Sequence, residues 1–596
     1  MVKRKHPHRS IFYSCVGVLL AALFEGVTQK FSFLRKSLCC TAKWSLLYST
    51  CLHGGYRGEE FAVPVIREVL SNYDIDGVFL NAPHYEFCQC QICQDKYQEE
   101  YGCPLPHDFS LLESGWPSKS IRICTEKIYR AIKEKNKNIP LVLYYNPTGK
   151  EDIKEQLAFS DLLCTESQNI LSAGQKNLPV SGNPAMTMKV GLSIKENSQE
   201  ANPPFGIIHS CPGMDWRHTG LPKAEYLFWM AQIPANGGNI WHSITGFGET
   251  ITDKSILSCV QKINQMAKIC ESEMERVDSA ADVLLLWNGK ESSRGWFEGL
   301  TATQRQFDVA KIQQITEEKL RKYSCVVIPE NFSIEQVKDK LIHYVKEGGR
   351  LIQEGTKKEE LNPLFPLLGV RDVWQTSEKM VSSYLRISQK ENEIFADLSD
   401  KELLPHRGQV AYVMPKADSE VPATLVPPFA PLDAVGAPPE RASILSPKTD
   451  IPLMLLSKYQ QGEVLFLPFQ LSWLIREYGL PEHLTLMRNY ADWGARYKPL
   501  IQISAPYGLQ VSTFQNENSM LIHFVNGVGR RPLTAIMPLY HLEFTVLLPP
   551  NMILSSVSSC LGNQKIYAKQ KEDFVICRLE KLEIWDMIKL EWKKRS

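Results

Sequence analysis

The segment YDIDGVFLNAPHYEFCQCQICQDKYQEEYGC, residues 73–103, decides the fold class of this chain. It opens with a short apolar run, residues 77–80, which ends at the polar residue Asn81. A buried parallel strand has this pattern, because such a strand delivers a polar side chain to the rim of a β/α barrel. The segment therefore predicts one strand of a β/α barrel with a functional rim beside it.

A cysteine motif follows this strand directly. Cys88, Cys90 and Cys93 form C-x-C-x-x-C at the start of a helix-like segment. Thiols this close in sequence either bind a metal or form disulfides. The chain has 16 cysteines, too sparse for a disulfide scaffold, and only this cluster has the spacing of metal ligands. We expect a metal site, with free thiols or a disulfide as the alternatives.

The composition is that of an ordinary globular protein. With 596 residues the chain is too long for one core and predicts roughly two to four domains. Hydrophobic residues make up 44% and charged residues 22%. The 67 basic and 66 acidic residues leave a net charge of +1. This balance gives no indication of a nucleic acid or an anionic membrane as a partner.

The N-terminus is basic and then apolar. The apolar run at residues 11–24 follows the basic side chains of Lys3, Arg4, Lys5 and Arg9. This order fits a secretory signal, and the run is short for a membrane span. Secretion or membrane anchoring therefore stands open beside a cytoplasmic location.

Strand-like and helix-like segments alternate between residues 44 and 276. We expect strands at 77–80, 140–146, 161–166, 205–210 and 238–243, and helices at 61–71, 88–101, 121–135, 223–233 and 254–273. This alternation predicts a parallel α/β sheet or barrel. A complete barrel has eight strands, and about five are recognisable, so we expect a (β/α)8-type barrel that is incomplete on its N-terminal side.

Two further domains are predicted beyond the barrel. Apolar strands alternate with helices from residue 281 and predict a flavodoxin-like α/β domain, whose Pro-rich insert at 373–450 we expect to form loops. Short alternating strands from residue 500 predict a small C-terminal β-sandwich. The expected layout is a leader at 1–43, the barrel at 44–276, the α/β domain at 281–495 and the β domain at 500–596.

The stretch TCLHGGYRGEEFAVPVIREVLSNYDIDGVFLN, followed by C-x-C-x-x-C and Tyr101-Gly102, resembles bacterial-type glycosyl hydrolases that are distant relatives of glycoside hydrolase family 42, the β-galactosidases. Residues 281–470 resemble the trimerisation domain of that family. The resemblance implies a glycosidase that acts on a carbohydrate substrate, and a homo-oligomer, by likeness a trimer. It also implies a structural zinc held by the cysteine motif, and no organic cofactor.

The zinc ligands that the resemblance implies are Cys88, Cys90 and Cys93, with a fourth cysteine upstream. Cys51 is the candidate for this fourth position, and Cys103 is its substitute. Four thiolates would form a closed structural site, because no coordination position remains open for chemistry.

The catalytic residues are harder to place. Glycoside hydrolysis normally uses two carboxyl groups. Family 42 enzymes end the fourth barrel strand with Asn-Glu, whereas this chain has Asn81-Ala82. Glu166, at the end of the strand at 161–166, is our candidate acid/base or nucleophile; the alternative is a polar residue that bonds a neighbouring loop. Glu249 or Asp253 is a candidate second carboxylate, or a helix cap.

Further polar and aromatic residues follow the strand ends and are candidate substrate contacts, with Trp216 stacking on a sugar face. They are Asn81, His84, Trp216, Arg217, His218 and His242. Two functions remain open: a glycoside hydrolase that uses carboxylate acid/base chemistry, and an inactive relative that serves as a sugar-binding or oligomeric scaffold protein.

Overall fold

The computed structural model describes residues 38–40, 46–54, 57–80, 85–145, 147, 154–167, 183–195, 202–213, 216–244, 251–428, 444 and 446–595. They fall into two compact units, Met1–Glu166 with Ile194–Gly206, and Ser167–Ser193 with Ile207–Ser596. The expected leader lies outside the described residues, apart from a short strand at Leu38–Cys40. In the part of the chain that is described, no helix has the length and apolar character that crossing a bilayer requires.

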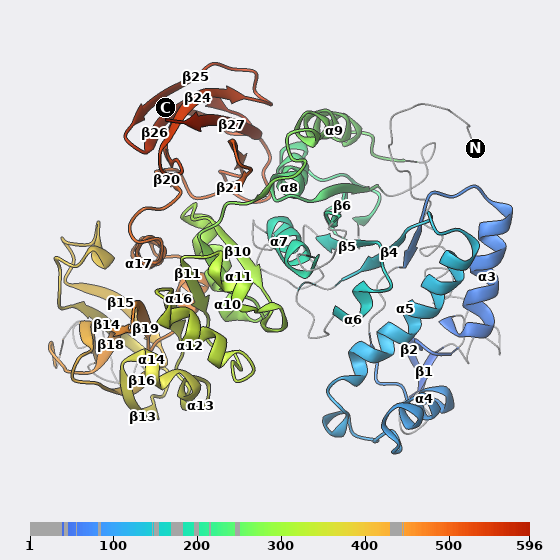
Figure 1. The fold of residues 1–596 in the computed structure, drawn as a ribbon, viewed down its shortest axis with the longest axis horizontal. Helices are drawn as coiled ribbons and strands as arrows, with labels where there is room; N and C mark the ends of the chain where they lie inside the picture. The colour runs from blue at the N-terminus through green and yellow to red at the C-terminus, as the bar shows by residue number, and fades with distance from the viewer. Residues whose placement is uncertain are drawn as a thin grey trace. The chain divides into compact units, whose positions relative to one another are not determined.

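The first unit contains parallel strands covered by helices (Figure 1). Its elements are β1 (Leu38–Cys40), β2 (Leu46–Thr50), α3 (Glu59–Asn72), β3 (Val78–Leu80), α4 (Gln91–Tyr101), η2 (Phe109–Leu111), α5 (Trp116–Lys135), β4 (Leu141–Tyr144), α6 (Lys154–Leu157) and β5 (Leu162–Ser167). Strand β3 pairs with β4 and β4 with β5, all in parallel, while β1 and β2 form an antiparallel pair.

Helix α5 shows how the sequence positions this sheet. It buries Ile121, Cys124, Ile128 and Ile132, which recur at every third or fourth position and therefore share one helix face. This face packs with Val78 of β3 in a single apolar cluster. Because α3 packs against α5, the two helices together cover one side of the strands.

The following elements continue the alternation of strands and helices. They are α7 (Asn183–Lys195), β6 (Phe205–His209), α8 (Lys223–Ala235), β7 (Asn239–Ser243), α9 (Leu257–Glu271) and β8 (Asp278–Ser279). The strands follow the order β3-β4-β5-β6-β7 in one sheet. Strand order that equals chain order is what consecutive β/α units of a barrel produce. Each expected strand is present, and the prediction of a barrel-type α/β fold is confirmed.

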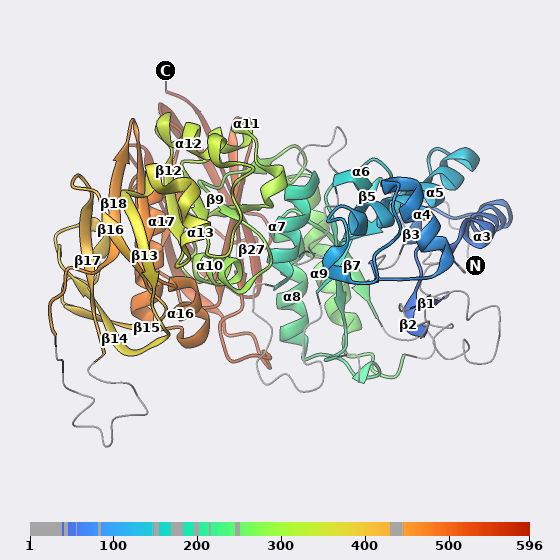
Figure 2. The same ribbon diagram turned by 90° about the horizontal axis from the view of Figure 1, so that it is seen from below.

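Helices α8 and α9 pack against each other in the second unit (Figure 2). Every residue of α8 from Ala224 to Ala235 is buried. Apart from Glu225 and Gln232 these residues are mostly apolar, and a helix with apolar residues on every side is buried on all sides. In α8 the reason is that the helix also contacts strands of the C-terminal β region.

The α/β region has the expected flavodoxin-like order. Its elements are β9 (Val283–Leu286), α10 (Glu291–Ala302), β10 (Phe307–Ala310), η4 (Ile312–Gln314), α11 (Glu317–Arg321), β11 (Cys325–Ile328), α12 (Lys338–Lys346), β12 (Arg350–Glu354), α13 (Lys358–Leu361), η5 (Asn362–Leu364), α14 (Phe365–Leu368), β19 (Gly462–Leu467), α16 (Leu471–Tyr478) and α17 (Pro481–Gly494). The parallel strands run β10-β9-β11-β12-β19, which is the order 2-1-3-4-5 of doubly wound folds.

The expectation of loops at 373–450 is wrong for much of that range. It contains β13 (Val370–Thr376), β14 (Met380–Ile387), η6 (Glu393–Phe395), β15 (Leu403–Gly408), β16 (Ala411–Pro415) and β17 (Glu420–Val426). Strands β17, β14 and β15 extend the main sheet through β18 (Pro452–Tyr459), and β13 pairs with β16. Pro422 is tolerated inside β17 because the ladder to β18 is irregular between Glu420 and Ala423.

The C-terminal region is the expected β-sandwich. Its strands are β20 (Ile501–Ile503), β21 (Leu509–Gln515), β22 (Ser519–Asn526), β23 (Leu539–Leu547), β24 (Met552–Ser559), β25 (Ile566–Lys571), β26 (Phe574–Leu582) and β27 (Trp585–Lys594). One sheet has the order β20-β23-β26-β25 and the other β24-β27-β22-β21-β8. Phe524 and Phe544, one from each sheet, meet in the core with ring centroids 4.9 Å apart.

Candidate metal centre and candidate active site

Four cysteines of the first unit lie close together. The Sγ atoms of Cys51, Cys88, Cys90 and Cys93 are all within 4.8 Å of one another. Sγ of Cys51 lies 3.4 Å from that of Cys93 and 3.7 Å from that of Cys90. Tetrahedral zinc with bonds of about 2.3 Å to sulfur places sulfurs about 3.8 Å apart, so the spacing fits such an ion. Cys103 is exposed and outside this group, so the candidate for the fourth position is Cys51.

Local structure brings the four thiols to one point. Cys51 directly follows β2, and the N–H of Gly54 donates a hydrogen bond to its sulfur over 3.3 Å. Cys90 is the N-cap residue of α4, and Cys93 lies in the first turn of this helix. Partial positive charge at a helix N-terminus favours a thiolate. The end of α4 therefore supplies one contribution that favours thiolates in this group.

The other surroundings oppose ionisation of most of the group. Apart from the partly exposed Cys90, the thiols are buried beside the rings of Tyr97 and Trp116. Bonding to Cys88 raises the pKa of Cys51, and bonding to Cys51 raises the pKa of Cys93. The pKa of Cys90 is lowered, chiefly by its bond to Cys51. Protein groups alone thus favour at most part of the set as thiolates, and a divalent cation would ionise all four.

His53 is a buried neighbour of this group that the sequence did not single out. Its Nε2 lies 2.7 Å from Oγ of Ser120, and its ring centroid is 5.7 Å from that of Trp116. Burial, reinforced by nearby lysines, lowers the pKa of His53 to about 4, so the ring is neutral at pH 7. His53 is not in the metal-ligand group, and only its proximity to Cys51 in sequence could have drawn attention to it.

Glu166 lies near the C-terminal end of β5, half-buried. Tyr144, at the end of the neighbouring strand β4, faces the same end of the sheet. Burial, followed by the charge of Glu166, raises the pKa of Tyr144 to about 12. The phenol is therefore protonated at pH 7 near the carboxyl group of Glu166, where it can donate a hydrogen bond.

The predicted substrate contacts differ in what surrounds them. Trp216, Arg217 and His218 follow β6 and are exposed, with 55% of Trp216 open to solvent. Asn81 and His84 lie outside the described residues, as does Glu249. The role of these residues in substrate binding stays a prediction.

His242 of β7 is held by two helices. Its Nδ1 lies 2.6 Å from the hydroxyl of Tyr226 in α8, and its Nε2 lies 2.8 Å from Oδ1 of Asn264 in α9. Burial lowers the pKa of His242, although the hydrogen bond with Asn264 acts in the opposite direction. A substrate that used this imidazole would have to compete with Asn264.

Asp253 has the surroundings of a loop-fastening residue. Its carboxylate accepts hydrogen bonds from the N–H of Gly220 over 2.7 Å and of Ser255 over 2.9 Å. These bonds, those from Ser255 first, lower its pKa. An ionised and occupied carboxylate is poorly suited to donating a proton, which favours the capping role over the catalytic one.

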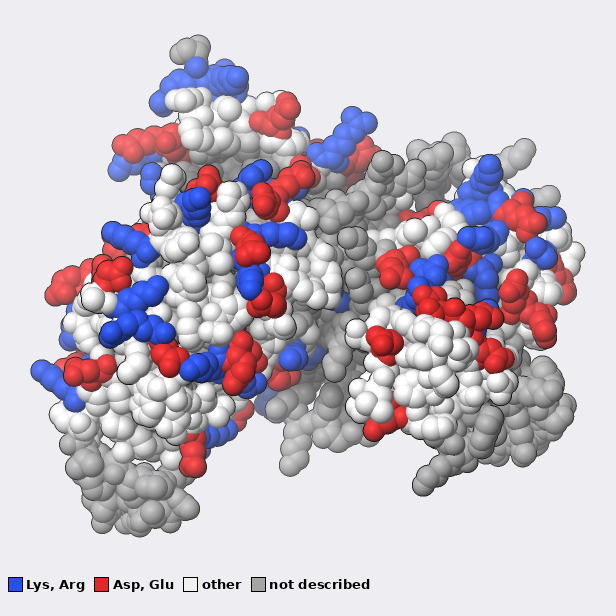
Figure 3. Space-filling model, turned by 60° about the horizontal axis from the view of Figure 1, so that its bottom comes forward, with Lys and Arg blue, Asp and Glu red and all other residues white. Residues whose placement is uncertain are grey.

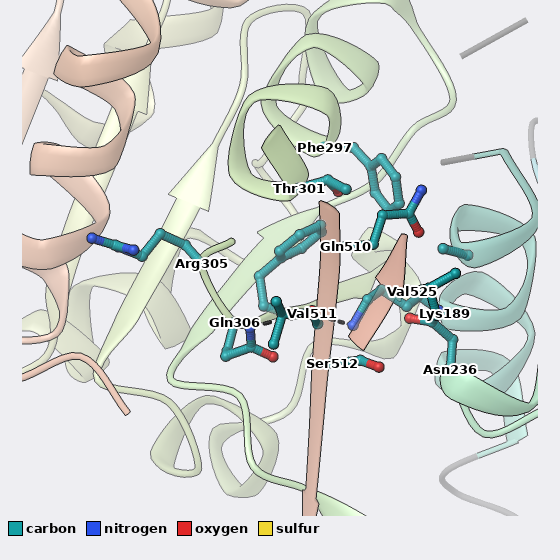
Figure 4. Close-up of a pocket in the computed structure, with 12 residues that line it drawn as sticks. Lys189, Asn236, Phe297, Thr301, Arg305, Gln306, Gln510, Val511, Ser512 and Val525 are labelled. Atoms are coloured by element: carbon teal, nitrogen blue, oxygen red, sulfur yellow. Dashed lines mark hydrogen bonds between the residues drawn. The ribbon is translucent and has the colours of Figure 1, made fainter. Parts of the chain in front are cut away.

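A small internal cavity lies in the second unit among α7, α10 and β21 (Figure 4). Lys189 points toward it and donates to the carbonyl of Phe307 over 2.7 Å, whereas Arg305 turns away to pair with Asp492. Its volume of about 10 Å³ accommodates about one water molecule. The cavity is too small for a sugar.

Charged side chains of both signs are interspersed on the face of the molecule in Figure 3. This mixture agrees with the nearly balanced charge of the whole chain.

Comparison with known proteins bears on the fold. A family model described as "GLMA-like, second domain" matches residues 273–362, and no curated protein matches the chain. Among solved structures, the chain is similar to α-L-fucosidase isoenzyme 2 from Paenibacillus thiaminolyticus, with a TM-score of 0.76 and 15% identity, covering 98% of this chain and 87% of that chain.

Two β-galactosidases are also similar in structure. That from Bacillus circulans sp. alkalophilus has a TM-score of 0.61 and 11% identity, covering 95% of this chain and 87% of that one. Gan42B, a GH42 β-galactosidase from G. stearothermophilus, has a TM-score of 0.61 and 12% identity. This match covers 96% of this chain and 86% of that one. This chain therefore has the fold of the family 42 β-galactosidases and of this fucosidase, which confirms the resemblance read from its sequence.

Proposed function

We propose that this chain is a glycoside hydrolase that cleaves O-glycosidic bonds of a carbohydrate, with Glu166 as its acid/base or nucleophile. The observation that carries the proposal is the place of Glu166 near the C-terminal end of a parallel strand, in a fold shared with three solved glycosidases. Catalytic groups of β/α barrels lie at this end of the strands.

The chemistry follows from the surroundings of the carboxyl group. As an acid, Glu166 would protonate the leaving glycosidic oxygen; as a nucleophile, it would attack the anomeric carbon. Tyr144 stays protonated at pH 7 and can donate a hydrogen bond at this end of the sheet. As a separate part of the proposal, exposed Trp216 of the second unit offers a ring face to a sugar, with Arg217 and His218 next to it in the sequence for hydroxyl groups.

We also propose a structural zinc at Cys51, Cys88, Cys90 and Cys93. Four thiols with sulfur spacings close to those of a tetrahedral site support this assignment. A bound zinc would supply charge compensation and a cross-link, and no coordination position would remain for substrate. Catalysis would therefore depend on the zinc only through the folded state.

The assembly and the domain borders belong to the same proposal. We propose a barrel at 44–276, a trimerisation-like domain at 281–495 and a β domain at 500–596, and a homo-oligomer, by resemblance a trimer. Size-exclusion chromatography with light scattering measures the oligomeric state directly. A molar mass near that of three chains supports the trimer, and the mass of one chain contradicts it.

Hydrolysis of aryl glycosides tests the activity. The wild-type chain and E166Q would be compared on aryl β-galactosides and α-fucosides. E134Q is the matched control, because Glu134 is 67% exposed and pairs with Arg67 on the surface. We expect E166Q alone to lose turnover. E249Q tests whether Glu249 supplies the second carboxyl group.

The inactive relative is the second candidate function. Ala82 favours it, because it stands where family 42 carries the Glu of Asn-Glu, and an alanine side chain has no proton to donate. Sugar binding by a folded chain without turnover of any glycoside in the panel would support this function and exclude the first.

A further inference from the structure

A hollow of about 240 Å³ lies in the α/β region of the second unit, between the neighbouring helices α11 and α12 (Figure 2). Ser324 directly precedes β11 and Gly349 directly precedes β12, and both line the hollow. The hollow therefore lies at the N-terminal ends of these strands. Doubly wound folds ordinarily bind their ligands at the opposite, carboxyl ends, so this is a different place from the usual ligand site of the fold.

One wall of the hollow is shaped by close packing. The hydroxyl of Tyr344 in α12 donates to the carbonyl of Tyr323 over 3.0 Å, and both side chains are buried. A Cβ at Gly349 would lie 2.3 Å from the ring carbon Cζ of Tyr344, so only glycine lets the chain pass this close to the ring. Gly348 beside it has a φ of +103°, which glycine adopts without strain. The wall is therefore preformed, as the walls of ligand pockets usually are.

Two cationic side chains of the hollow are held by neutral groups. Nζ of Lys340 donates to the carbonyl of Ile315 over 2.9 Å, and Nη2 of Arg496 donates to the carbonyl of Gly348 over 2.6 Å. In the described part of the chain neither side chain forms an ion pair. A carbonyl orients a cation without cancelling its charge, and each side chain keeps further N–H groups that can donate to a ligand.

The other charged groups of the hollow nearly balance one another. Arg321 pairs with Glu317 over 3.4 Å, and exposed Glu347 adds a second carboxylate. Together with the two cations held by carbonyls, three cations and two carboxylates line the hollow. It therefore carries one excess positive charge while His343 is neutral.

We propose that this hollow binds a small organic monoanion, namely a carboxylate attached to an apolar ring. The excess positive charge selects an anion, and Leu320 with the ring of Tyr344 offers apolar surface for the rest of the ligand. The volume is below the range of about 300–1,000 Å³ that is usual for ligand pockets, which favours a ligand of one or two rings. The site goes beyond glycoside hydrolysis. It lies entirely in the second unit, whereas Glu166 belongs to the first, so the two proposals stand or fall separately.

Saturation-transfer NMR with the folded full-length chain tests the ligand class. Indole-3-acetate, indole-3-acetamide and tryptamine share one ring system and carry a negative, a neutral and a positive side chain. We expect indole-3-acetate to bind with a Kd of about 1 mM or tighter, an ordinary affinity for a ligand of this size. The amide should bind roughly three- to tenfold more weakly, and tryptamine more weakly still. Equal binding of the three compounds, or no saturation by indole-3-acetate below about 10 mM, would overturn the proposal.

Variants place the ligand in the hollow. We expect K340Q/R496Q to weaken indole-3-acetate binding by about tenfold or more, because both uncancelled cations are lost. E347Q should tighten it, because a repelling carboxylate is removed. K338Q is the matched control, since Lys338 lies on the same helix but outside the hollow.

The candidate active site provides the last comparison. We expect E166Q to bind indole-3-acetate as the wild type does. Circular dichroism checks that each variant is folded, and E347Q tests the charge argument at an exposed position where folding is not at risk. Unchanged binding in both folded K340Q/R496Q and E347Q, or a loss confined to E166Q, would overturn the assignment of the ligand to this hollow.

Discussion

The sulfur atoms of Cys51 and Cys93 lie 3.4 Å apart, although 42 residues separate them in the sequence. Cys51 follows β2, and Cys93 lies in the first turn of α4. A metal held between them would close a long loop, and cross-links that close long loops remove much entropy from the unfolded chain. The cluster is thus placed to stabilise the first unit.

Metal content provides the first prediction. We expect inductively coupled plasma mass spectrometry to find about one zinc per chain in the purified protein, since the four thiols form one closed site. C93S should lose the metal and unfold at a lower temperature, because the remaining ligands leave an incomplete set. C103S is the matched control and should keep the metal and the unfolding temperature of the wild type, because Cys103 is outside the group. A full zinc content in C93S would contradict the assignment.

A buried ion pair provides the second prediction. Glu225 of α8 is fully buried and accepts two bonds of 2.9 Å from Nε of Arg531, and one of 2.8 Å from the N–H of Leu533. R531M would leave this carboxylate without its cation, which costs about 3–5 kcal/mol in buried pairs. Denaturant unfolding measures the loss.

The double variant E225M/R531M shows how much of the loss comes from the interaction between the two side chains. Apolar side chains of similar size can replace a buried pair at little cost, so we expect the double variant to be more stable than R531M. A double variant whose loss equals the sum of the two single losses would show that the two side chains do not act as a pair.

The sequence predicts the parts of this fold that repeat a strong local pattern. The barrel strands and helix α5 fall at their expected places, because buried strands are continuous apolar runs and α5 has apolar residues at helical spacing. Strands β13–β17 were missed, since polar residues and internal prolines mask the alternation along them. Helix α7 was missed as well, because Gly191 interrupts it and its apolar residues do not gather on one face.

Prediction of the candidate sites is limited by long-range contacts. The spacing of Cys88, Cys90 and Cys93 indicated a metal knuckle, but Cys51 came only from a family resemblance, since no local pattern joins ligands 37 residues or more apart. The contact between His209 and Ser243 was missed for the same reason, since 34 residues separate them in the sequence.

The pH dependence of stability provides the third prediction. Glu354 is fully buried and accepts bonds from Nε1 of Trp296 over 2.9 Å and from Oγ of Ser472 over 2.5 Å. Burial, with a further contribution from Glu330, raises its pKa from 4.5 to about 8. Between these values the unfolded chain releases a proton that the folded chain keeps. The contribution to stability is therefore complete below about pH 4.5 and is lost as the pH rises to about 8, at about 1.4 kcal/mol per pH unit.

Unfolding of E354Q between pH 5 and pH 8 measures this effect. We expect the wild type to lose more stability over this interval than E354Q, because glutamine does not titrate. E335Q is the control, since Glu335 is 60% exposed and pairs with Lys338. Parallel pH curves for the wild type and E354Q would show that Glu354 is ionised in the folded protein.

Turnover by E166Q tests the central claim most directly. The wild type and E166Q would be assayed on aryl β-galactosides and α-fucosides, with folding of both proteins checked by circular dichroism. We predict turnover by the wild type and a loss of about 10²–10⁴-fold in kcat in E166Q, the range for a general acid or base. Equal turnover by both folded proteins would contradict the assignment of Glu166.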